Sequence, residues 1–166
     1  MFDNLNPLFN EETPVTKKSP AINKNPETFQ TKRKRAPRSD KGHTVKFPIT
    51  LEQQIKFKSS LKRLKFHFPD IDIKQTKYNT LLLWYSLDHL HIVDWDMDYI
   101  GTSQYHMTTK LPEFRFSEIG GEHGLSIQRG LSDRKAVYKM TISALDYIEK
   151  GGYYGEILKQ IRAAKK

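Results

Sequence analysis

Two short stretches of the chain carry side chains that can hydrogen-bond to nucleic acid. The two stretches have these residue types in the same order. Thr44–Lys46 and Thr108–Lys110 both read Thr-x-Lys, and an apolar residue and a proline follow each. A Lys ammonium can donate to guanine O6 and N7, and a Thr hydroxyl can bond either kind of base. An alternative is that the two lysines only protect a strand edge from aggregation. Because the pattern repeats sixty-four positions later, contact with a base or a phosphate is favoured over this alternative.

Both stretches alternate in a way that is typical of a short strand with one buried face. Successive side chains point to opposite faces of a strand, so we expect one set to face a core and the other to face outward. The expected inward set is Val45, Phe47, Thr109 and Leu111. The expected outward set, and the predicted base contacts, are Thr44, Lys46, His106, Thr108 and Lys110.

Two helices are predicted after the first strand. Thr50–Gln53 has the spacing of a capping box and is expected to begin the first helix. Phe68-Pro69 is expected to end this helix. The apolar residues of this helix lie on two adjoining faces: Leu51 and Ile55 on one, and Phe57, Leu61 and Leu64 on the other. A second helix, over about 76–89, is apolar almost all round and must be buried on several sides.

The second half of the chain has a similar order of signals. A helix from about Glu113 is expected to end at Gly120-Gly121 or Gly124. Ser132-Asp133 then caps another helix, which ends at Gly151-Gly152, and 156–166 forms a short terminal helix.

Charge and composition narrow the classes of partner. The chain has 166 residues, a net charge of +9 and no cysteine, so disulfides, thiolate metal sites and a cysteine nucleophile are excluded. The positive charge favours a polyanionic partner, and it is densest in Lys32–Arg35. Residues 1–42 are rich in proline and poor in apolar periodicity, which predicts a disordered basic arm. With no long apolar run and no secretory pattern in the first twenty residues, we expect a cytoplasmic protein that does not bind membranes.

The order strand, proline, helix, turn, buried helix between His43 and His89 resembles the ribbon-helix-helix family of DNA-binding proteins, the MetJ/Arc type. The residues that stand at the family's core positions are Val45, Phe47, Leu51 and Ile55. The resemblance implies a mainly α fold with a short two-stranded antiparallel β-ribbon that enters the major groove. Because the pattern recurs, the chain resembles a tandem member, in which one chain supplies both strands.

The domain organisation that this resemblance implies has five parts. They are a disordered basic arm (1–42), a first ribbon-helix-helix unit (43–92), a connector (93–104), a second, diverged unit (105–150) and a C-terminal helix (151–166). The second unit has a shorter first helix, with Arg115 where the first unit has Leu51, and a loosely matched link over 126–131.

Phosphate contacts are also implied by the resemblance, at the start of each buried helix, where free N–H groups and a partial positive charge attract anions. The residues so placed are Thr76, Lys77, Ser132, Arg134 and Lys135. The arm residues Lys32, Arg33, Lys34 and Arg35 are expected to follow the DNA backbone or to enter a minor groove.

No catalytic residue, metal site or cofactor is predicted. Asp94, Asp96, Asp98 and Gly101 begin like a calcium loop, but Tyr105 stands where the bidentate Glu belongs. An acidic connector in solvent is the better interpretation of these aspartates.

Three functions remain open. Tandem members of the family include plasmid relaxosome accessory proteins, so the first function is sequence-specific binding of double-stranded DNA at a transfer origin. The partners that this function implies are a relaxase or another relaxosome protein, and a second copy of the chain on DNA. The second is a ribbon-helix-helix transcriptional repressor that uses the same residues. The third, from another class, is a protein–protein adaptor that binds through Phe2–Phe9 and the C-terminal helix, with an incidental basic surface.

Overall fold

The computed structural model describes residues 42–151 and 153–163, with side chains up to 159, and all of them belong to one compact unit. The expected arm lies outside this description except for Gly42, which already belongs to the first strand. The regular elements are β1 (Gly42–Ile49), α1 (Leu51–His67), α2 (Gln75–Asp88), the 3₁₀ turn η2 (Leu90–Ile92), β2 (Tyr105–Pro112), α3 (Glu113–Gly120), α4 (Leu125–Gln128), α5 (Asp133–Gly151) and α6 (Tyr154–Ala163). The described part is mostly helical with a two-stranded antiparallel sheet, which confirms the coarse fold class.

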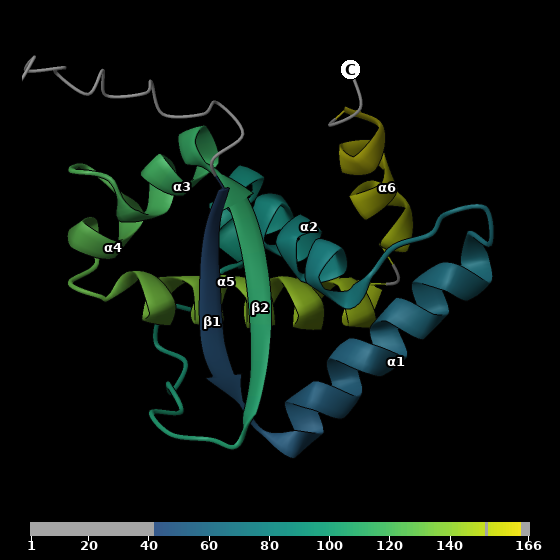
Figure 1. Ribbon diagram of the computed structural model, residues 1–166, viewed down its shortest axis with the longest axis horizontal. Helices are drawn as coiled ribbons and strands as arrows, with labels where there is room; N and C mark the ends of the chain where they lie inside the picture. The colour runs from purple at the N-terminus through teal and green to yellow at the C-terminus, as the bar shows by residue number, and fades with distance from the viewer. Residues whose placement is uncertain (1–41, 152, 164–166) are drawn as a thin grey trace, which may run out of the picture. The chain divides into compact units, whose positions relative to one another are not determined.

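β1 and β2 form this sheet although α1 and α2 lie between them in the chain. Figure 1 shows the strands side by side as a ribbon that crosses in front of α5. Within the pairing Thr44 lies opposite Lys110, Val45 opposite Thr109 and Lys46 opposite Thr108. The two Thr-x-Lys stretches therefore meet, as neighbouring antiparallel segments.

The ribbon has one buried face and one exposed face. Phe47, Met107, Thr109 and Leu111 are buried, and Val45 is partly buried against the same core. On the opposite face the side chains are exposed or half-buried, except for Pro48, which is buried at the end of β1. The predicted inward set thus faces the core.

α1 begins and ends where local signals predict. The Thr50 hydroxyl accepts from the Gln53 N–H, and the Gln53 side chain accepts from the Thr50 N–H, each at 3.0 Å. At the other end Phe68 follows the last helical residue, and its N–H donates to the Leu64 carbonyl. These contacts involve residues three or four apart, so the sequence alone can specify them.

The predicted core role of Leu51 and Ile55 is wrong. Leu51 is 50% exposed and Ile55 is 59% exposed. α1 instead buries its adjoining face, through Phe57, Ser60 and Leu64. The helix offers two apolar faces, and the position of the neighbouring helices decides which of them is covered.

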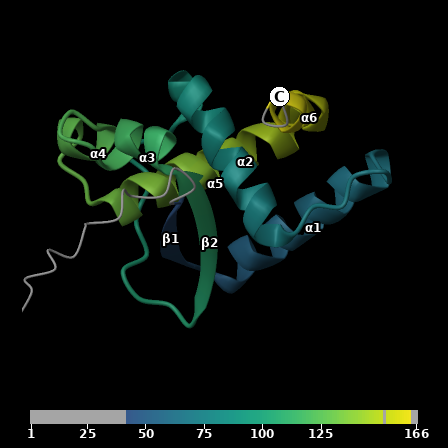
Figure 2. The same cartoon turned by 45° about the horizontal axis from the view of Figure 1, so that its top comes forward.

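α2 and α5 make most of the core behind the ribbon. They pack against each other, and Figures 1 and 2 show both on the same side of the strands. Tyr78, Leu81, Leu82 and Leu83 of α2 are at most 1% exposed, as expected for a helix that is apolar nearly all round. α5 contributes a continuous buried run over 136–145. The ribbon's inner face closes this core.

The connector between η2 and β2 is held against α5 by polar contacts. Lys139 is only 7% exposed, and its ammonium donates to the carbonyls of Trp95 and Met97. The N–H of Asp94 donates to the Ser143 hydroxyl at 3.0 Å. A buried lysine needs such acceptors, and here the irregular backbone of the connector supplies them.

A short helix, α4, lies in the stretch expected to be only a link. It follows Gly124, where any Cβ would come within 2.3 Å of the Ile119 carbonyl oxygen, so only glycine allows the chain to pass so close to the end of α3. The Ser126 hydroxyl donates to that same carbonyl at 2.7 Å. The second half of the chain therefore has an extra turn of helix that the first half lacks between its two helices.

Candidate nucleic-acid interface

The outer face of the ribbon gathers the polar side chains that the sequence predicted. Thr44, Lys46, His106 and Lys110 are exposed, and Thr108 is half-buried. Thr44 lies opposite Lys110, and Lys46 lies opposite Thr108. Each cross-strand pair therefore places one hydroxyl beside one ammonium. Strands about 4.8 Å apart form a ribbon that fits a major groove about 12 Å wide.

The free edge of β2 is secured by two polar residues of α2 that sequence reasoning missed. The Asn79 side-chain amide donates to the Thr108 carbonyl at 3.1 Å, and the Lys110 N–H donates to the Thr80 hydroxyl at 3.0 Å. The Gln75 side-chain amide donates to Oδ1 of Asn79 at 2.8 Å, which orients the Asn79 amide. The backbone groups of the edge that Asn79 and Thr80 satisfy belong to Thr108 and Lys110, whose own side chains face outward.

A signal for this contact was present in the sequence. Asn79-Thr80 is a polar pair within an otherwise apolar stretch of helix, and both residues are at most 3% exposed. Buried polar groups need partners. The pair therefore implied a nearby backbone with free hydrogen-bonding groups, although the sequence did not show which one.

The helix starts carry the predicted phosphate-contact residues, all exposed. They are Thr76 and Lys77 on α2, and Ser132, Arg134 and Lys135 at the start of α5. The first turn of α2 has no acidic residue, and Lys74 precedes it without a side-chain cap. α5 differs, because the Ser132 hydroxyl accepts from the Lys135 N–H at 3.4 Å and Asp133 lies in the first turn.

Two of these lysines lie over aromatic rings. The Lys77 ammonium is 5.5 Å from the centre of the Trp84 ring, and the Lys135 ammonium is 5.6 Å from the centre of the Tyr99 ring. Such contacts are worth about 0.5–1 kcal/mol at exposed sites. They restrict where the two charges lie without neutralising them.

Several other cations are engaged within the fold. The Lys56 ammonium donates to Asp146 at 2.6 Å, and this hydrogen bond raises the pKa of Lys56 above its ordinary value. Arg115 forms ion pairs with Asp88 at 3.1 Å and with Glu118 at 3.2 Å. These cations stabilise contacts between helices and are poor candidates for a polyanion.

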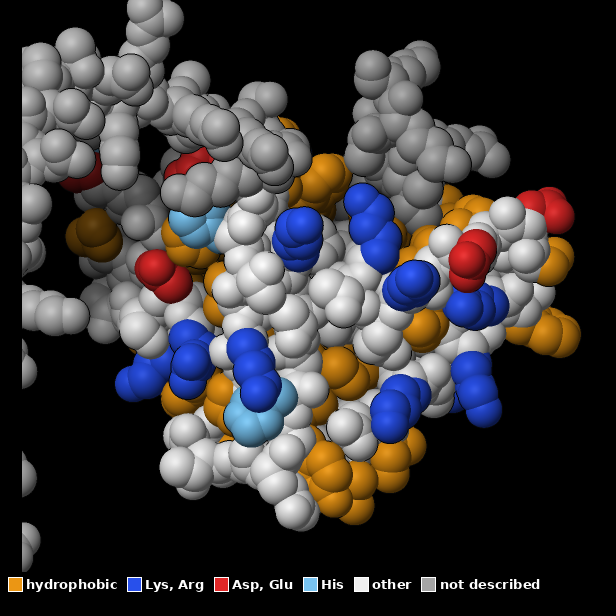
Figure 3. Space-filling model, in the orientation of Figure 1, with side chains coloured by type: hydrophobic (Ala, Val, Ile, Leu, Met, Phe, Trp, Pro, Cys, Tyr) orange, Lys and Arg blue, Asp and Glu red, His pale blue; other side chains and the backbone are white. Residues whose placement is uncertain are grey.

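Figure 3 shows where the charge gathers on the side that carries the ribbon. Lys and Arg side chains lie over the strands and over the helices on both sides of them, whereas acidic side chains are few in that region. A surface of this kind attracts phosphate and raises the rate of encounter with a polyanion. The predicted arm contacts Lys32, Arg33, Lys34 and Arg35 lie outside the described residues.

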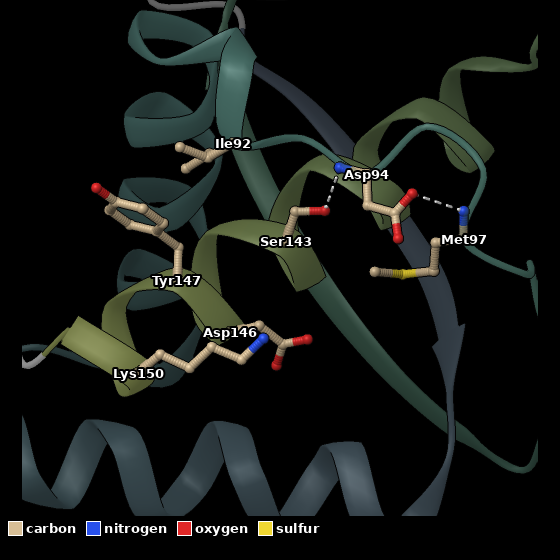
Figure 4. Close-up of a pocket in the computed structure, with 7 residues that line it drawn as sticks. All are labelled: Ile92, Asp94, Met97, Ser143, Asp146, Tyr147 and Lys150. Atoms are coloured by element: carbon tan, nitrogen blue, oxygen red, sulfur yellow. Dashed lines mark hydrogen bonds between the residues drawn. The ribbon is translucent and has the colours of Figure 1, made fainter.

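Two pockets lie away from the predicted contact residues. One, of about 190 Å³, lies between α5 and the segment formed by η2 and the connector, and these parts supply all the side chains drawn in Figure 4. It is lined by Ile92, Asp94, Met97, Ser143, Asp146, Tyr147 and Lys150. The other, of about 250 Å³, is lined by Tyr85, Asp88, His89, Glu156 and Lys159. Both are smaller than the roughly 300–1,000 Å³ of ordinary ligand sites.

Within the described ranges, no group of three His, Asp or Glu residues is placed to hold a metal ion. None of the helices in those ranges combines the length and the apolar character needed to cross a bilayer. A search of protein-family models, of curated proteins and of solved structures finds no match to this chain.

Proposed function

We propose that this protein binds double-stranded DNA in a sequence-specific manner by laying the outer face of the β1–β2 ribbon in the major groove. The observation that carries the proposal is the pairing that brings Thr44, Lys46, Thr108 and Lys110 onto one outward face. These side chains can read base edges, and a two-stranded ribbon has the width to reach them.

The register of the ribbon supports a tandem ribbon-helix-helix architecture. When the two Thr-x-Lys stretches are aligned, Lys46 corresponds to Lys110 and Thr44 corresponds to Thr108. In the observed pairing, a two-fold axis through the Val45–Thr109 pair relates the same residues, Lys46 to Lys110 and Thr44 to Thr108. A slip of one residue would destroy this agreement and would turn the other face outward.

The surroundings of the ribbon supply sequence-independent affinity. Lys77 and Lys135 lie at the starts of α2 and α5, and the uncapped start of α2 adds partial positive charge and free N–H groups. Each phosphate that such a residue neutralises steepens the salt dependence of binding by about 0.9. Phosphate contacts set the position of the ribbon, and the ribbon reads the bases.

The proposed cellular role is that of an accessory protein at a plasmid transfer origin, where the bound protein assists a relaxase. This step follows from the resemblance to tandem family members. A transcriptional repressor would use the same ribbon, so the location of the target site separates the two roles.

In the decisive experiment, the full chain is used to select binding sites from a pool of random duplexes. The affinity of the chain for the selected duplex and for random DNA is then measured over a range of salt concentrations. We expect one recurring site, bound at least a thousandfold more tightly than random DNA. A chain that enriches no sequence and binds all duplexes alike contradicts the proposal and favours the adaptor function. Footprinting of the selected site on the DNA around the protein's own gene then places it at a transfer origin or at a promoter.

A further inference from the structure

The outer face of the ribbon is two-fold symmetric at its centre and asymmetric at its ends. The central pairs, Thr44 with Lys110 and Lys46 with Thr108, exchange under the axis through Val45 and Thr109. The same axis exchanges Gly42 with His106. One end of the reading face therefore bears an imidazole where the other end has no side chain.

The environments of these two positions differ as well. His106 is exposed and lies opposite Pro48. At Gly42 a Cβ would come within 2.9 Å of Cε and 3.3 Å of Cγ of Lys110, so the Lys110 stem lies over the glycine. Among the described residues, the glycine end thus offers only the lysine already present in the symmetric centre, whereas the other end adds a separate group.

The residue that follows the ribbon adds to this asymmetry. Glu113 comes directly after β2, at the Gly42 end, and its carboxylate pairs with the His43 ring at 2.5 Å while its side chain remains 60% exposed. The residue related to it by the same exchange is Ile49, which is fully buried. A carboxylate disfavours close approach of phosphate, so, counting only the described residues, the Gly42 end is the less favourable one for DNA.

We infer that the protein recognises a site with a two-fold-symmetric core and one specified flank, and that His106 is the residue that specifies this flank. The inference rests on the proposed function. A ring N–H of His106 can donate to N7 or O6 of a purine. His106 lies three residues along β2 from Thr109, which is about 10 Å at about 3.3 Å per residue, or roughly three base-pair steps from the centre of the site. The protein consequently binds in one orientation.

The test compares the full chain with His106→Gly, which gives both ends of the ribbon the same residue, and with His106→Ala, which separates loss of the ring from added backbone freedom. Starting from the selected site, the base pairs on one flank and then on the other are changed, and the affinity for each duplex is measured. For the unaltered chain we expect a loss of about tenfold on one flank and less than twofold on the other. For both variants we expect less than twofold on either flank, with the preference for the core retained.

Two results would overturn the inference while leaving the proposed function intact: equal losses on the two flanks for the unaltered chain, or an unchanged difference between the flanks in both variants. Failure to enrich any core sequence would instead contradict the proposed function. Because His106 is exposed, His106→Ala is expected to leave the melting temperature nearly unchanged, whereas His106→Gly should lower it further, because a glycine in a strand loses more backbone entropy on folding. Thermal unfolding checks both.

Discussion

Lys46 of β1 lies directly opposite Thr108 of β2, the second residue coming from the other half of the chain. Lys46 is exposed and Thr108 is half-buried, and the carbonyl of Thr108 accepts a hydrogen bond from Asn79. The same residue thus anchors the ribbon through its backbone and presents its hydroxyl outward. This hydrogen bond ties the outer face of the ribbon to α2, and for the proposed binding to DNA such pre-organisation limits the entropy lost on association.

Replacing the ribbon lysines tests the reading face. Lys46→Ala and Lys110→Ala are each expected to weaken binding to the selected site by about 1–3 kcal/mol. Each should change the free energy of unfolding by less than about 0.5 kcal/mol, because both side chains are exposed. Fluorescence anisotropy and urea unfolding measure the two quantities. Lys159→Ala, an exposed lysine on α6, is the charge-matched control and should leave specific binding unchanged. Loss of stability without loss of binding would mean that the lysines act on the fold.

The lysines at the helix starts are expected to act without sequence preference. Lys77→Ala or Lys135→Ala should lower affinity for selected and random duplexes by the same factor and reduce the slope of log affinity against log salt by about 0.9 each. A salt titration on both duplexes makes the measurement, with Lys150→Ala at the far end of α5 as the control. A change in the base preference would contradict a pure phosphate role.

The clamp between α2 and β2 is expected to hold the ribbon in place. Thr80→Val removes the acceptor of the Lys110 N–H and leaves that group unpaired, which should cost about 1–3 kcal/mol of stability. Amide exchange at Lys110 should accelerate, a local effect that a general loss of packing does not predict. Ser86→Ala is the control, because the Ser86 hydroxyl is equally buried but bonds only to Leu83 of its own helix. Equal exchange at Lys110 in both variants would argue against the clamp.

Stability is expected to fall at high pH. Burial raises the pKa of Tyr78 well above its ordinary value near 10, and burial together with the carboxylate of Glu156 does the same for Tyr85. Above about pH 10 the unfolded chain has lost these protons while the folded chain keeps them, so the free energy of unfolding decreases as pH rises. The raised pKa of Lys56 acts in the same direction.

Tyr78→Phe isolates the contribution of Tyr78 to this effect. The variant loses the 2.6 Å hydrogen bond to Ser60, which should cost about 1 kcal/mol at neutral pH, and its stability should decline less steeply above pH 10. Urea unfolding at several pH values between 8 and 11 supplies both numbers. An identical decline in the variant and the unaltered chain would show that other groups govern alkaline unfolding.

The two apolar faces of α1 should respond very differently to truncation. Leu64→Ala is expected to cost about 2–5 kcal/mol, because Leu64 is 1% exposed. Leu51→Ala and Ile55→Ala should each cost less than about 0.5 kcal/mol. Thermal or urea unfolding distinguishes the outcomes, and a large cost at Ile55 would mean that this face is covered in solution.

The sequence alone specified the local parts of this structure. The capping box at Thr50 and the end of α1 at Phe68 depend on residues within one turn of helix. The two sides of the ribbon follow from the alternation of side chains along a strand, which needs no knowledge of the rest of the fold. The pairing of β1 with β2 was accessible only because the Thr-x-Lys pattern recurs and marks the two partners.

The tertiary structure decided which alternative each ambiguous pattern adopts. α1 had two apolar faces, and the packing of α2 and α5 left Leu51 and Ile55 in solvent. Asn79 and Thr80 were visible as buried polar residues, but only the folded chain shows that they secure the edge of β2. The physical reason is the same in both cases: burial and hydrogen bonding between distant segments depend on the relative positions of whole elements, whereas caps and strand alternation depend on the covalent geometry of a few consecutive residues.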